Sequence, residues 1–63
     1  MMRARVLVVE DERLLGEAIC DLLGDEFDVE LATTVAKASA RLREDPSFEV
    51  ILCDAQLPDG TAL

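Results

Sequence analysis

The sequence predicts an α/β fold, in which a doubly wound parallel sheet carries helices on both faces. Three observations predict it: segments of strand and helix character alternate, the connections between them are short, and the first strand is almost wholly aliphatic. Strands of a parallel sheet are covered on both faces, so they are continuous apolar runs. The expected order is β-α-β-α-β with right-handed crossovers, in one domain over residues 1–63.

The first half of the chain predicts two strands and a helix. Residues 4–9 are rich in valine and end abruptly at acidic residues, which indicates a buried strand. The following segment has an apolar stripe at helical spacing and Gly24 as its stop. Residues 27–31 alternate between apolar and acidic side chains, which predicts a strand near the edge of the sheet. The stripe expected to face the sheet comprises Leu14, Leu15, Ala18, Ile19, Leu22 and Leu23.

The second half predicts one more helix and one more strand. Thr33 or Thr34 is expected to cap the helix, whose thin apolar face is followed by the helix-ending pair Asp45-Pro46. Residues 48–53 form the third expected strand, which closes on an aspartate. Residues 57–60 have the composition of a turn.

Composition and charge exclude several classes of protein. Hydrophobic residues make up 51% of the chain and charged residues 32%, which indicates a globular rather than a disordered protein. The net charge of −8 argues against nucleic-acid binding and suits divalent cations or basic partners. The aliphatic run at residues 6–9 is too short for a signal-peptide core or a membrane span, so we expect a cytoplasmic protein.

The two cysteines, Cys20 and Cys53, lie in strongly apolar stretches. We expect them to be buried free thiols, since free cysteine is among the most buried residue types. The chain has no histidine and no further cysteine pair, which argues against a zinc site or a disulfide framework.

Acidic residues follow two of the expected strands. Glu10 and Asp11 come after the first strand, and Asp54 comes after the third. If these strands are neighbours, their carboxyl ends share one edge and three carboxylates converge there. Such a cluster suits Mg²⁺, which prefers oxygen ligands, and a carboxylate can also accept a phosphoryl group. Each acidic group taken alone is more often a solvated helix cap or an ordinary strand end.

Two segments resemble the receiver domains of bacterial response regulators. Residues 5–12 are similar to the opening strand and acidic pair of that family, and residues 50–60 to the strand and loop around its phosphorylated aspartate. The separation between the two segments also fits. The resemblance implies a flavodoxin-like fold with strand order 2-1-3-4-5, of which this chain would be the amino-terminal half, ending after the phosphoacceptor loop.

The resemblance implies a role for each matching residue. Asp54 would accept a phosphoryl group from a sensor histidine kinase or phosphotransfer protein. Glu10 and Asp11 would form the acidic pair around Mg²⁺ with Asp54, Asp11 as a direct ligand and Glu10 through water. Gln56 would offer its backbone carbonyl to the metal. The protein would be a phosphorelay component and not an enzyme, beyond self-catalysed phosphotransfer and dephosphorylation.

Two features of the family have no counterpart in these 63 residues: a Ser or Thr ending a fourth strand and a Lys ending a fifth. A receiver-like interaction module that is never phosphorylated is therefore the alternative function. The third strand, internal in the family, would here be an apolar edge at Val50, Ile51 and Leu52. Exposed edges invite pairing with another chain, so we expect self-association, aggregation or partial disorder.

Two other classes of site match the sequence poorly. Residues 59–61 match the tail of the nucleophile motif of haloacid-dehalogenase-type phosphatases, but Leu57 occupies the nucleophile position. An EF-hand calcium loop after Asp54 is interrupted by Pro58 and lacks the required later glutamate.

Overall fold

A computed structural model describes residues 3–53 of the chain, and these residues have the expected order β-α-β-α-β. The predicted α/β class is therefore confirmed. The elements are β1 (Arg5–Val9), α1 (Arg13–Leu23), β2 (Asp28–Ala32), α2 (Val35–Glu44) and β3 (Val50–Cys53).

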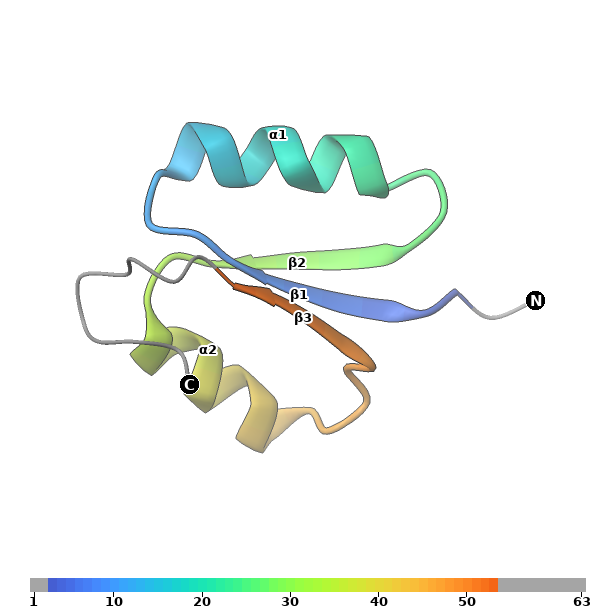
Figure 1. Ribbon diagram of the computed structural model, residues 1–63. Coiled ribbons are helices and arrows are strands. Elements are labelled where there is room, and N and C mark those ends of the chain that lie inside the picture. Colours follow the sequence, from blue (N-terminus) through green and yellow to red (C-terminus); the bar gives the residue numbers. More distant parts are fainter. Residues whose placement is uncertain (1–2, 54–63) are drawn as a thin grey trace.

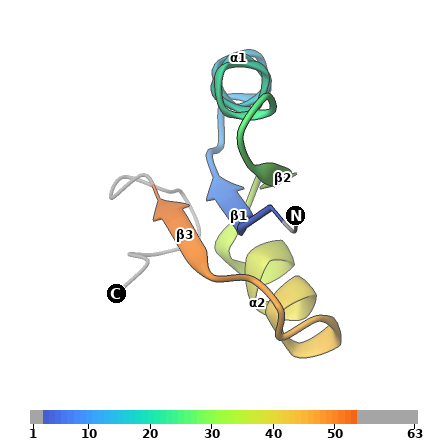
Figure 2. The same ribbon diagram turned by 90° about the vertical axis from the view of Figure 1, so that its right-hand side faces the viewer.

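The three strands are parallel and lie in the order β2-β1-β3. Helix α1 covers one face of the sheet and α2 covers the other, as the two views in Figures 1 and 2 show. The register places Val9 beside Ala32 on one side and beside Cys53 on the other. The first and third strands are thus neighbours, as the predicted convergence of acidic residues requires.

Strand β1 is the centre of the core. Residues Val6 to Val9 are at most 3% exposed, and Leu7 is fully buried. Leu7 and Val9 pack with Ala32 and Ala38, and partly buried side chains of the α2 side close this cluster. A strand that is paired on both sides and covered on both faces has no solvent-facing side, so its uninterrupted apolar run follows from its position. The partly buried side chains are Val35, Leu42 and Phe48.

The predicted inward stripe of α1 is correct for Ile19 and Leu23, which are partly buried, but wrong for its other residues. Leu14 and Leu22 are more than 80% exposed, and Leu15 is nearly half exposed. A helix that crosses a narrow sheet buries only one line of residues, with spacing i, i+3, i+4, i+7. The line that meets the sheet consists of Gly16, which is buried, and the partly buried Ile19, Cys20 and Leu23.

Gly16 allows α1 to approach β2 closely. A β-carbon placed at this position would lie 2.5 Å from Cδ1 of Leu31, well inside van der Waals contact. The hydrogen of glycine fits where a methyl group would displace the leucine side chain. The contact thus depends on glycine for its small size.

Helix α2 begins and ends as the sequence predicts. Thr34 is the N-cap, and its Oγ1 accepts a hydrogen bond of 3.0 Å from the backbone N–H of Lys37. Asp45 is the C-cap, and its N–H donates to the carbonyl oxygen of Arg41 at 2.9 Å. Pro46 follows immediately and is incompatible with a further helical turn.

Arg5 connects three segments at the amino-terminal end of the sheet. Its guanidinium lies 3.1 Å from the carboxylate of Asp28 and 3.1 Å from that of Glu30, both on β2. The same guanidinium pairs with Asp45, at the end of α2. A single arginine therefore joins β1, β2 and the connection from α2 to β3.

Phe48 lies in this cluster rather than in the third strand, so the predicted start of that strand is two residues early. The ring stacks under the guanidinium of Arg5, 4.3 Å from the ring centroid, and Arg41 lies at 5.6 Å. Cations at this distance are attracted to the negative face of an aromatic ring. The ring therefore serves as a platform for two arginines, and β3 begins only at Val50.

Neither cysteine forms a disulfide, but the predicted burial of Cys53 is wrong. Cys53 is exposed because β3 is an edge strand of the described sheet, whereas Cys20 on α1 is partly buried. Burial, together with the negative charges of Asp21 and Glu17, raises the pKa of the Cys20 thiol.

The edge formed by β3 is apolar and open in the part of the chain that the structure describes. Val50, Ile51 and Leu52 are 44%, 49% and 42% exposed, respectively. The strand is paired with β1 on one side only within residues 3–53. Its other side offers backbone N–H and C=O groups to a further strand.

We predict that stability decreases in acid through Asp45. Hydrogen bonds from the hydroxyl and N–H of Ser47, and then from Arg5, lower the pKa of Asp45 to about 2 from its ordinary value of 3.8. A carboxyl whose pKa is lower in the folded state stabilises the fold above the unfolded value and loses that contribution as pH falls. The melting temperature should therefore decrease between about pH 4 and pH 2. Asp45→Asn should be less stable at neutral pH and change less over this window; parallel curves for the two proteins would contradict the assignment.

We predict that the 63-residue chain associates through β3. Light scattering should give a mass above that of the monomer, and Ile51→Lys should shift the distribution toward monomer by placing a charge on the edge. Leu22→Lys is the matched control, because it introduces the same charge at an exposed leucine of α1. A compact monomer for the unmodified chain, or equal effects of the two substitutions, would rule out this edge as the contact.

Candidate functional site

The acidic residues that follow β1 lie at the carboxyl-terminal edge of the sheet. Val9 and Cys53 are partners in the register, so β1 and β3 end together at this edge. Glu10 comes directly after β1, and its N–H donates to the carbonyl oxygen of Ala32 at 3.0 Å. Pairing with β2 thus continues for one residue, and it fixes the backbone that carries the Glu10 side chain.

Glu10 is the one charged residue that is buried in the described part of the chain, with 6% of its surface exposed. A buried carboxylate needs hydrogen-bond partners because it has lost its water. Its Oε2 accepts a hydrogen bond of 3.1 Å from the backbone N–H of Glu12, the N-cap residue of α1. The side chain of Glu12 makes no capping hydrogen bond. The Glu10 carboxylate instead accepts from a backbone N–H at the start of the helix.

Asp11 differs from its neighbour in being exposed to solvent. The sequence-predicted acidic pair therefore contains one carboxylate held by the backbone and one that faces water. Carboxylate oxygens are hard donors, which is the chemistry that Mg²⁺ requires, and this ion usually keeps several of its waters. By donor type, these two residues fit such an ion.

A hollow of about 280 Å³ lies next to Glu10, between α1 and the ends of β1 and β3. Its wall is mostly apolar, and Glu10 contributes the carboxylate. Apolar surroundings strengthen electrostatic interactions by excluding water. The residues that line it are Val8, Val9, Glu10, Ile19, Leu52 and Cys53.

The other predicted ligands, Asp54 and Gln56, lie outside the described residues, as does the predicted turn at 57–60. Within residues 3–53 no group of three or more His, Cys, Asp or Glu side chains is arranged to hold a metal ion. Of the predicted set, the structure thus places Glu10 and Asp11, adjacent in sequence and different in burial.

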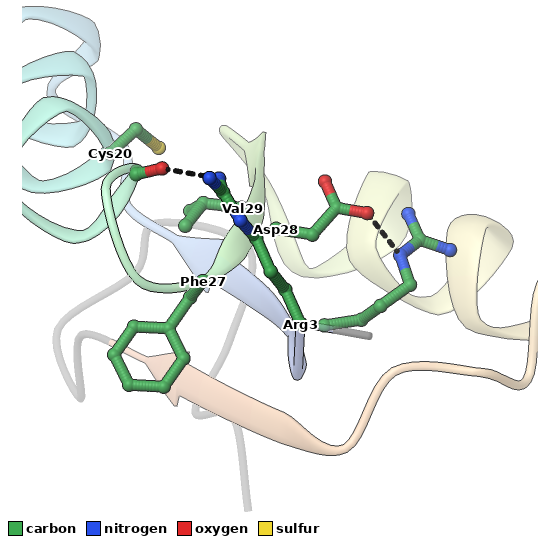
Figure 3. A pocket seen from close by; sticks show the side chains of 7 residues that line it. Arg3, Cys20, Phe27, Asp28 and Val29 are labelled. Atoms are coloured by element: carbon green, nitrogen blue, oxygen red, sulfur yellow. Dashed lines mark hydrogen bonds and ion pairs between the residues drawn. The ribbon is translucent and has the colours of Figure 1, made fainter. Parts of the chain in front are cut away.

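A larger hollow, of about 650 Å³, lies at the opposite end of the sheet (Figure 3). Arg3 donates a hydrogen bond of 2.9 Å to the carbonyl oxygen of Gly24, and Arg5 pairs with Asp28 across it. Both arginines therefore already have protein partners here. Sequence reasoning missed this hollow because its walls come from the chain start, α1 and β2. Its lining comprises Arg3, Arg5, Cys20, Gly24, Phe27, Asp28 and Val29.

Neither helix in the described part of the chain is both long enough and apolar enough to span a membrane.

Comparison with known proteins gives one informative match. No protein-family model matches the chain, and no curated protein does so either. Among solved structures, the chain is similar to the non-phosphorylated HemR receiver domain from Leptospira biflexa, with 37% sequence identity and a TM-score of 0.81. The match covers 94% of this chain and 48% of that one, so the chain spans about half the length of the solved protein.

Identity at this level over nearly the whole chain accompanies the same fold, and the strand order β2-β1-β3 agrees with the order that the sequence resemblance implies. Strand β1, which the acidic pair follows, and β3, which precedes Asp54 in the sequence, are paired in one parallel sheet. The chain therefore has the sequence and the fold of the amino-terminal half of a receiver domain, the module of two-component response regulators.

Proposed function

We propose that this chain is the phosphoacceptor part of a phosphorelay, in which Asp54 receives a phosphoryl group from a sensor histidine kinase or phosphotransfer protein in the cytoplasm. The observation that carries the proposal is the pairing of Val9 with Cys53. Glu10 and Asp54 are the next residues in sequence after this pair. Ligands of open α/β sheets bind at the carboxyl ends of the strands, where the strand order reverses, and β1 and β3 flank that point.

The proposed reaction is a transfer between two nucleophiles. A carboxylate oxygen of Asp54 forms a bond to phosphorus while the bond from phosphorus to the histidine nitrogen of the donor breaks. The leaving imidazole keeps the electron pair and takes a proton. Bound Mg²⁺ would offset the negative charge of the phosphoryl oxygens. Each protein molecule accepts one phosphoryl group per reaction and is itself modified. It is therefore a substrate of the relay, not an enzyme with turnover.

The described residues support different roles for Glu10 and Asp11 in the proposed metal site. Glu10 is held by the Glu12 N–H and is buried, so it supplies a fixed negative charge and orients the loop. Asp11 is exposed and is the better direct ligand. Asp54 and the backbone carbonyl of Gln56 would complete the protein's share of the coordination shell, with water in the remaining positions.

A second candidate function is docking without phosphorylation. It is favoured by the apolar surface that α1 presents, where Leu14 and Leu22 are more than 80% exposed. Exposed apolar patches often mark interaction sites. The phosphorylation experiment separates the two functions, because docking alone requires no adduct on Asp54.

We predict that acetyl phosphate and Mg²⁺ give a phosphoryl adduct that intact-mass spectrometry detects on the chain. The adduct should be absent from Asp54→Ala, because the acceptor oxygen is lost. Asp21→Asn is the control, since it removes an exposed acid on α1 away from the acidic edge. An adduct of equal yield on Asp54→Ala would show that another residue is the acceptor, and no adduct on any variant would favour the docking function.

We predict that Mg²⁺ affinity depends on Glu10 even though its contact with the ion passes through water. Glu10→Gln keeps an oxygen that accepts from Glu12, but it removes the charge. Loss of an outer-shell partner typically weakens metal binding by about tenfold to a hundredfold. Isothermal titration with MgCl₂ should show this decrease, with Glu17→Gln as the control; equal affinity of both variants would remove Glu10 from the site.

A further inference from the structure

Half of the basic residues of this acidic chain line one hollow. The chain has six Lys and Arg residues and a net charge of −8, yet Arg13, Lys37 and Arg41 all border a space of about 400 Å³. Arg13 lies at the start of α1, and the other two lie on α2. The hollow lies beside β2, which is an edge strand of the sheet within the described residues.

Two of these three cations have little negative charge beside them. Lys37 takes part in none of the ion pairs within residues 3–53, and its Nζ lies 3.4 Å from the hydroxyl of Thr33. Arg13 pairs with Glu17 at 3.6 Å, and both side chains are more than half exposed, so water screens this pair. Arg41 differs, because Glu30 lies at 2.7 Å and neutralises it. Arg13 and Lys37 therefore supply the positive charge of the hollow.

The backbone of β2 adds a polar group at the same place. Ala32 accepts from Glu10 and Asp28 donates to Ala4, so both of these residues point their backbone groups toward the β1 side. Backbone groups alternate in direction along a strand, so those of Leu31 point to the open side. Leu31 and Thr33 both line the hollow, which thus combines two cations, a hydroxyl group and a strand edge.

The remaining lining is apolar and comes from Leu31, Ala32 and Ala40. A site lined by both cations and apolar side chains suits a ligand that has an anionic group attached to a short carbon chain. Arginine and lysine side chains bind phosphate oxygens through charge-assisted hydrogen bonds. From this arrangement we infer a second binding site, separate from the acidic edge, that takes a small phosphate monoester between Arg13 and Lys37.

The test measures binding of butyl phosphate by isothermal titration at constant ionic strength. The Asp54→Ala chain in EDTA is used, so that neither the proposed phosphoacceptor nor a metal ion contributes to the signal. Saturable binding is expected, and Lys37→Gln or Arg13→Gln should weaken it by about tenfold, as loss of a charge-assisted hydrogen bond does. Arg43→Gln is the matched control, because Arg43 is an exposed cation on α2 that does not line the hollow.

The outcomes separate the site from a general effect of charge. Equal weakening by Arg43→Gln, or the same heat with sodium chloride in place of butyl phosphate, would overturn the proposal. Binding of inorganic phosphate as strong as that of butyl phosphate would also overturn it, because the apolar lining residues would then have no role. Circular dichroism of each variant checks that a loss of binding does not reflect unfolding. Failure here leaves the phosphorelay function untouched, since Asp54 and Mg²⁺ take no part in the measurement.

Discussion

Burial of β1 between two parallel neighbours is the constraint on which the rest of the fold depends. Its residues Val6 to Val9 are almost completely inaccessible, and both helices pack on the sheet that it centres. At roughly 25 cal/mol per Å² of apolar surface, such burial is the main favourable contribution available to a chain of this size. The strand also determines where Glu10 lies, because the acidic residue comes immediately after the last buried valine. The core and the candidate site are therefore two ends of the same element.

The sequence predicted what depends on local pattern. The aliphatic run of β1, the Thr34 cap, the helix end at Asp45 and the neighbouring positions of β1 and β3 are all confirmed. The first three rest on spacing or on a residue type with a strong backbone preference, whereas the neighbouring strands follow from the resemblance to receiver domains. The sequence also predicts that the acidic pair lies at the carboxyl-terminal edge of the sheet, because parallel strands present their carboxyl ends together.

The incorrect predictions concern which side chains are buried, because burial depends on the helices and strands that pack beside each residue. The apolar residues of α1 have a broad distribution around the helix, and only the narrow sheet decides that Gly16 rather than Leu15 faces inward. Cys53 is apolar in context but exposed, because β3 is an edge strand in the described sheet. The sequence pattern places Phe48 in the strand, because the residues next to it in sequence do not show that two arginines from other elements pack on its ring.

The close approach of Gly16 to Leu31 has a consequence for the loop of residues 10–12, which directly precedes the first turn of the helix. Residues 10–12 join β1 to α1, so the depth at which the helix lies on the sheet also sets the position of the Glu12 amide that holds Glu10. One added methyl group at position 16 would overlap the end of the Leu31 side chain, so that side chain would have to move for the helix to keep this depth. Gly16 also contacts this loop directly, because its N–H donates a hydrogen bond of 2.9 Å to the carbonyl oxygen of Glu12. The packing of α1 on β2 and the position of the acidic residues are therefore linked through the backbone.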